Sequence, residues 1–139
     1  MSIAISDVYI HRVEYCETDA MKIVHHSEYI KWMEYSRQQY FLAHGLNWAE
    51  LENKYGIMMP ILNLEITYKG MTKFGDVVKI VPKLEMFNGV FIKFSYTIMD
   101  VRDNTIKAIG STKSGFVDAS YHPVILQDKA PEYYRMLVM

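Results

Sequence analysis

The sequence predicts an α+β fold in which an antiparallel sheet wraps around one long helix. Two observations support this: one long stretch has helical periodicity, and four later stretches alternate with a period of two and are joined by short turns. Strands joined in this way pair antiparallel, and a helix with one apolar face packs onto such a sheet. With a further strand near the start, the sheet should have five strands within a single domain over residues 1–139.

The first expected elements are a strand at residues 8–15 and a helix that begins after Ser27. The strand alternates, which is typical of a half-buried position. Ser27 can cap the helix and Glu28 suits its first turn, whereas His44-Gly45 should end it. The expected core stripe of the helix has members three or four residues apart: Tyr29, Trp32, Met33, Ser36, Tyr40 and Ala43.

A short helix and four strands should follow. Asn47 and Glu50 resemble a helix cap, so we expect a short helix ending near Tyr55-Gly56. Strands are expected at 62–68, 77–85, 90–99 and 105–117, with turns at 74–76, 88–89 and 103–104. Pro82 lacks an N–H, which indicates that its strand is at an edge or bulged there.

Composition excludes several classes of protein. Half of the residues are apolar, which excludes disorder, and a net charge of −1 without a basic run gives no reason to expect nucleic-acid or anionic-membrane binding. No stretch approaches the ~18 uninterrupted apolar residues of a membrane span, and the N-terminus does not resemble a signal peptide. Cys16 is the only cysteine, so no internal disulfide can form. We therefore expect a cytoplasmic protein.

The chain is rich in large adaptable side chains, with eleven Tyr, ten Met and six Phe. This exceeds what one small core should hold, and such residues are common in subunit interfaces. We therefore expect a homo-oligomer, at least a dimer.

The most informative stretch runs from Tyr15 to His26. It places Asp19 seven residues ahead of His26, on a short loop facing the start of the long helix. Unpaired backbone N–H groups and the positive end of the helix dipole lie at such a start. A carboxylate and a set of donors for a developing oxyanion are what cleavage of an acyl ester requires.

This stretch resembles the signature of hotdog-fold acyl-CoA thioesterases of the 4-hydroxybenzoyl-CoA thioesterase / YbgC type. The matching residues are Thr18-Asp19, Ile23-Val24, His26, Tyr29, Glu34 and Arg37, and residues 74–78 and 116–124 are also similar. The resemblance implies a five-stranded sheet around a central helix, in a homodimer or homotetramer with the active site between subunits. It implies hydrolysis of an acyl-CoA, aryl-CoA or acyl carrier protein thioester, with no metal or other cofactor. Asp19 would be nucleophile or general base, and the backbone amide of His26 the oxyanion donor.

Two positions depart from the family pattern, and five residues are candidates for substrate binding. The family commonly has Gly where Lys22 stands and Asn where Glu28 stands. The candidates are Tyr29 and Trp32 on the helix, Met59 and Pro60 at the start of a strand, and Lys69, whose charge suits the phosphates of CoA. The alternative for these residues is core packing, or a solvated loop position for the lysine.

Other functions remain open. A non-catalytic hotdog domain could bind acyl-CoA or acyl carrier protein, and a hotdog hydratase or dehydratase would use the ring of His26 as an acid–base group. Cys16 as a nucleophile is less favoured than a buried structural thiol. A metal pair at His25-His26 is disfavoured, because no third ligand accompanies it at suitable spacing.

Overall fold

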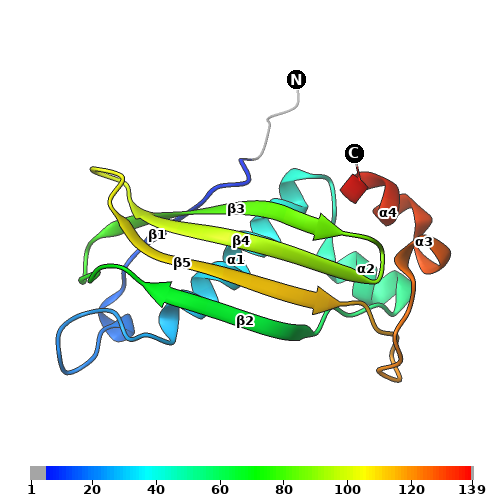
Figure 1. Ribbon diagram of the computed structural model, residues 1–139, viewed down its shortest axis with the longest axis horizontal. Helices are drawn as coiled ribbons and strands as arrows, with labels where there is room; N and C mark the ends of the chain where they lie inside the picture. Colours follow the sequence, from blue (N-terminus) through cyan, green and yellow to red (C-terminus); the bar gives the residue numbers. More distant parts are fainter. Residues whose placement is uncertain (1–5, 139) are drawn as a thin grey trace.

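Figure 1 shows the computed structural model, which describes residues 6–138. In chain order the elements are β1 (Tyr9–Arg12), the 3₁₀ helix η1 (Tyr15–Glu17), α1 (Glu28–Ala43), α2 (Trp48–Tyr55), β2 (Ile61–Tyr68), β3 (Val77–Phe87), β4 (Phe91–Asp100), β5 (Ile106–Gly115), α3 (Leu126–Lys129) and α4 (Pro131–Val138).

The five strands form one antiparallel sheet in the order β1-β3-β4-β5-β2, and α1 lies across one face of it (Figure 1). Strand β4 shows why the residues fold this way, since alternate side chains are buried: Ile92, Phe94, Tyr96 and Ile98. From α1, Tyr29, Trp32, Met33 and Ser36 are buried. The predicted five-stranded sheet packed on a long helix is confirmed.

The two edge strands of the sheet, β1 and β2, differ in length. Among the residues that the structure describes, strand β2 pairs only with β5, and Leu62 and Tyr68 on it are 54% and 44% exposed. Strand β3 is interior, but β1 pairs only with its residues 77–80. Pro82 therefore lies beyond the end of β1. No residue of β1 faces it there, so the N–H that proline lacks is not needed for a hydrogen bond to β1.

The first expected strand is shorter than the sequence predicted. It ends at Arg12, because the chain turns into η1, where the N–H of Glu17 donates to the carbonyl of Glu14. Cys16 is exposed, so the prediction of a buried thiol is wrong.

The start of α1 also differs from the prediction. Ser27 has helical backbone angles and makes no side-chain cap, because its hydroxyl contacts the ring of His25 instead, 2.7 Å from Nδ1. The N–H of Glu28 donates to the carbonyl of His25 at 3.0 Å, which closes the first turn.

The C-terminal helices α3 and α4 were not predicted. They pack beside α2 at one end of the sheet (Figure 1), with Leu126, Tyr133 and Leu137 buried. Pro131 at the first position of α4, followed by apolar residues four apart, was the available signal. None of the helices within residues 6–138 is long and apolar enough to cross a bilayer.

Candidate active site

Asp19 lies in a tight turn between η1 and α1. Its N–H donates to the carbonyl of Ile23 at 2.9 Å, and its Oδ1 accepts from the N–H of Met21 at 2.8 Å. The turn holds Lys22 at φ +63°, a left-handed conformation that glycine adopts more easily. The other oxygen, Oδ2, accepts from no protein donor within residues 6–138. One half of the carboxylate therefore fixes the turn, and the other half is free.

The backbone N–H of His26 is also free. Among the described residues it finds no acceptor, whereas the N–H of Ser27 donates to Nδ1 of the His25 ring at 3.2 Å. The carbonyl of His26 accepts from the phenol of Tyr68 at 2.7 Å, which ties the loop to β2. His26 precedes the cap position of α1, so its amide is free because of the loop conformation and not as part of the first helical turn.

The ring of His26 is exposed and stacks on the ring of His25, with centroids 4.1 Å apart. None of the side-chain hydrogen bonds found among residues 6–138 involves this ring. Within this part of the chain the ring therefore has no hydrogen-bond partner that would orient it as an acid or base.

Asp19 and His26 line the same open pocket. Its other lining residues are mainly apolar: Met21, Ile23, Val24, Tyr29, Tyr68, Gly70 and Met71. Burial raises the pKa of the Tyr29 phenol, even though its hydrogen bond to Thr72 opposes the shift, and burial also raises the pKa of Tyr68. Both phenols therefore stay neutral, and Asp19 is the only carboxylate among the lining residues.

Beneath the loop lies a buried carboxylate that the sequence reasoning did not single out. Glu17 is 8% exposed and accepts hydrogen bonds from His11, Trp32 and the N–H of Glu14. Burial alone would raise the pKa of Glu17, but these donors outweigh it and lower the pKa. The available signal was the three-residue spacing of Glu14 and Glu17, typical of a capping pair.

The remaining predicted site residues lie apart from Asp19. Trp32 is fully buried beneath the loop, where its N–H meets Glu17, and Lys69 is exposed next to Gly70 of the pocket wall. Met59 and Pro60 line a separate groove at the start of β2, whereas the Asp19 pocket lies at the end of that strand. A single subunit thus brings together Asp19, His26 and Tyr29, and leaves Met59 and Pro60 at the opposite end of β2.

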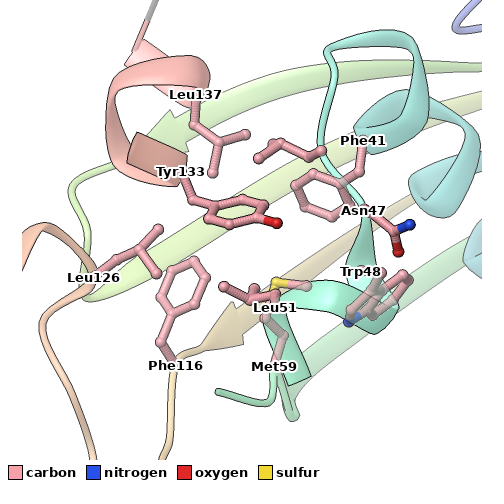
Figure 2. A pocket seen from close by; sticks show the side chains of 10 residues that line it. Phe41, Asn47, Trp48, Leu51, Met59, Phe116, Leu126, Tyr133 and Leu137 are labelled. Carbon is pink, nitrogen blue, oxygen red and sulfur yellow. The ribbon is translucent and has the colours of Figure 1, made fainter. Parts of the chain in front are cut away.

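A second, more enclosed pocket of about 10 Å³, with room for little more than one water, lies near the C-terminal end of α1 (Figure 2). It is lined by aromatic and aliphatic side chains from α1, α2, the C-terminal helices and the segments beside them: Phe41, Leu46, Trp48, Leu51, Met59, Phe116, Leu126, Tyr133 and Leu137, with Asn47 at its edge. Burial, together with neighbouring Glu50, raises the pKa of Tyr133 to about 12. This pocket has no nucleophile or base that is ionised near neutral pH.

Metal binding has no support in the described part of the chain. Within residues 6–138 there is no group of three or more His, Cys, Asp and Glu side chains that could hold an ion. His25 and His26 stack on each other, and Nδ1 of His25 is occupied by Ser27.

Comparison with known proteins agrees with this fold. Residues 13–132 match the model of a family described as the thioesterase-like superfamily. YneP of Bacillus subtilis (strain 168), provisionally named an acyl-CoA thioesterase, is 30% identical over 124 residues, 88% of each chain. The structure of a DHNA-CoA thioesterase from Staphylococcus aureus has a TM-score of 0.90 at 24% identity, covering 94% of this chain and 87% of its own. The structure of TT1821, a hypothetical protein from Thermus thermophilus, has a TM-score of 0.86 at 26% identity, covering 94% of this chain and 96% of its own. The fold is the hotdog fold of these structures, and the chain belongs to the thioesterase-like superfamily.

Proposed function

We propose that the chain hydrolyses the thioester of an acyl- or aryl-CoA to a carboxylate and free CoA. The observation that carries this proposal is that two residues lining one pocket, Asp19 and His26, each have a polar group without a partner among residues 6–138: one carboxylate oxygen and one backbone N–H. A carboxylate can attack a thioester carbonyl or activate a water, and an N–H can stabilise the negative oxygen that forms. The name of YneP supports CoA as the carrier.

The chemistry of the step balances with water as the only co-reactant. As nucleophile, Asp19 forms an acyl anhydride while the C–S bond breaks, and water then cleaves the anhydride to regenerate the carboxylate. As general base, Asp19 takes a proton from water as the water oxygen attacks the carbonyl. In both routes CoA leaves as thiolate or thiol, and the N–H of His26 binds the oxyanion. The neutral phenols of Tyr29 and Tyr68 are engaged with Thr72 and His26, which leaves Asp19 as the reacting group.

The test is a hydrolysis assay over a panel of acyl-CoAs, aryl-CoAs and acyl carrier protein thioesters, with Asp19→Asn run in parallel. We expect the wild type to release free thiol from at least one class of CoA thioester, and the variant to release far less from the same substrate. Binding of CoA thioesters without turnover would favour a non-catalytic acyl-CoA-binding domain. Hydration of an enoyl-CoA, lost in His26→Ala, would favour a hydratase.

We propose further that the site is completed by a second subunit across β2. The free edge of β2 can pair with the same edge of another copy, and Leu62 and Tyr68 expose apolar surface beside it. A twofold axis at this edge makes the two β2 strands antiparallel, so the end of one strand meets the start of the other. The partner's Pro60 segment would then lie against the Asp19 pocket, which supports the substrate-binding roles predicted for Met59 and Pro60. The cytoplasmic location likewise stays a prediction.

Mixing two inactive variants tests this arrangement. Asp19→Asn removes the carboxylate, and Met59→Trp should block the neighbouring subunit's pocket. A mixed dimer then keeps one intact site, so mixing the two proteins should restore about a quarter of wild-type activity. No recovery after verified subunit exchange, full activity of Met59→Trp alone, or a stable active monomer in sedimentation at micromolar concentration would contradict the shared site.

A further inference from the structure

We propose that Glu17 is a positioning residue for catalysis, because its buried carboxylate fixes the loop that carries Asp19 and His26. This inference rests on the proposed role of Asp19. Glu17 does not line the pocket and is 8% exposed, so it has no direct route to substrate. Its influence on the reaction must pass through the loop.

Three donors from three segments converge on the carboxylate of Glu17. Its Oε1 accepts from the N–H of Glu14 at 2.7 Å and from Nε2 of His11 on β1 at 2.8 Å. Its Oε2 accepts from the indole N–H of Trp32 on α1 at 2.8 Å. Because a carboxylate only accepts, Nε2 of His11 carries a proton, and its Nδ1 lies 3.0 Å from the phenol of Tyr9.

The main chain of Glu17 holds the other end of the loop. Its carbonyl accepts from the N–H of His25 at 2.8 Å, directly before His26. Between these two points, Thr18 bridges to Val24, whose N–H donates to the carbonyl of Thr72. One residue thus joins the sheet, the helix and both ends of the loop on which the carboxylate and the amide are presented.

These surroundings suit a carboxylate and not an amide. All three contacts are donors, so the side-chain NH₂ of Glu17→Gln would face a donor in either orientation. In the Oε2 position, the NH₂ would oppose the indole N–H of Trp32, and in the Oε1 position it would oppose the N–H of Glu14. A buried donor left without an acceptor is costly, so the loop should shift to relieve the conflict. Displacements of about 1 Å in a catalytic group can lower rates ~10²-fold.

The first experiment compares Glu17→Gln with a matched control, Asp100→Asn. Asp100 is a second buried carboxylate, 1% exposed, which accepts two hydrogen bonds from the side chain of Arg102 in the β4–β5 turn. At a temperature where both variants are fully folded, we expect Glu17→Gln to lower kcat ~10- to 100-fold with KM within about twofold. Asp100→Asn should lower the melting temperature but leave kcat unchanged. Hydrogen exchange in a peptide covering residues 17–27 should accelerate only in Glu17→Gln.

The second experiment is a rescue in a Trp32→Phe background. Removing the indole N–H takes away one donor, so the NH₂ of Glu17→Gln can occupy that side without opposing another donor, while its carbonyl still accepts from Glu14 and His11. Glu17→Gln should therefore lower kcat several-fold less in this background than in the wild type, a coupling that a purely structural loss would not produce. If Glu17→Gln does not fold, His11→Phe provides the same kcat-against-KM comparison with one donor removed.

Two results would overturn the proposal. One is a kcat of folded Glu17→Gln equal to that of Asp100→Asn, and the other is equal kcat losses with and without Trp32→Phe. An inactive Asp19→Asn beside a fully active Glu17→Gln would reject the positioning role alone, and an active Asp19→Asn would reject the proposed function itself.

Discussion

The two ends of helix α1 face pockets of opposite character. At its N-terminal end, a pocket is lined by Asp19 and His26, whose second carboxylate oxygen and backbone N–H have no partner within residues 6–138. At its C-terminal end, aromatic and aliphatic side chains surround an enclosed pocket (Figure 2). Large apolar pockets are the usual first choice for a ligand site, but this cavity of about 10 Å³ has room for little more than one water. This one has no group that could attack a carbonyl, so the less enclosed pocket is the better candidate for the chemistry.

The difference follows from what each end contributes to the free energy of folding. In a stable core, buried polar groups are hydrogen-bonded. The C-terminal end of α1 meets this requirement because the side chains around its pocket are mostly apolar. At the N-terminal end, the loop pairs its interior groups through Glu17, whereas Asp19 and His26 each keep one polar group without a partner among residues 6–138. We therefore expect substitutions at the first end to change mainly the rate of reaction and substitutions at the second to change mainly stability.

The largest expected effect on rate, beyond loss of Asp19 itself, comes from removing the amide of His26. His26→Pro should lower kcat ~10²–10³-fold, because proline has no N–H to bind the oxyanion. His26→Ala keeps the N–H and should retain a substantial share of activity. Steady-state kinetics on both variants, with circular dichroism to verify folding, make the comparison. An inactive but folded His26→Ala would assign the chemistry to the ring.

Truncation in the enclosed pocket should affect stability and not rate. Leu126 is fully buried in α3, so Leu126→Ala should lower the free energy of unfolding by about 2–5 kcal/mol through lost burial and an added cavity. Denaturant titration measures this loss, and kcat per folded protein should stay within about twofold of wild type. A drop in kcat comparable to that of His26→Pro would remove the distinction between the two ends.

The stabilisation by Glu17 should depend on pH. Its donors lower the pKa of the folded state below the ordinary value, so its contribution is complete at pH values above the unfolded pKa, ~4.3. The contribution is then lost as the pH falls through the lower folded pKa. The difference in melting temperature between wild type and Glu17→Gln should thus shrink between pH 6 and about pH 3. A difference that stays constant over this range would mean that the charge of Glu17 contributes nothing.

The smallest expected effect is at Lys22, whose backbone is held at φ +63°. Lys22→Gly relieves a left-handed conformation, so we expect a gain of up to about 1 kcal/mol in the free energy of unfolding. Turnover of a short pantetheine thioester should not change. If Lys22 contacts the phosphates of CoA, as its exposed position beside Asp19 permits, KM for the full CoA thioester should rise.

Much of the fold was predictable because local signals and tertiary packing agree. The helical stripe around Trp32, the turn at Asn88-Gly89 and the alternation of β4 each act over a few residues, and the structure confirms them. The helices α3 and α4 were missed because they are short, and their stability comes from packing against α2 and the end of the sheet.

The candidate site was predictable only in part. Asp19 and His26 lie within one loop, so their spacing already placed them together. The role of Glu17 depends on donors from β1 and α1, which no local pattern in the sequence reveals. Ser27 was misassigned as a cap because the neighbouring ring of His25 competes for its hydroxyl. Met59 and Pro60 lie at the far end of β2, and their relation to Asp19 depends on a second subunit.

The central claim is that the carboxylate of Asp19 performs the chemistry, and single-turnover kinetics test it most directly. With enzyme in excess over the best CoA thioester, the observed rate reports the chemical step and excludes product release. Asp19→Asn keeps the shape of the side chain and its Oδ1 acceptor for Met21, so the loop should stay folded. We predict that this variant lowers the single-turnover rate at least ~100-fold. A folded Asp19→Asn with a rate near that of the wild type would contradict the account.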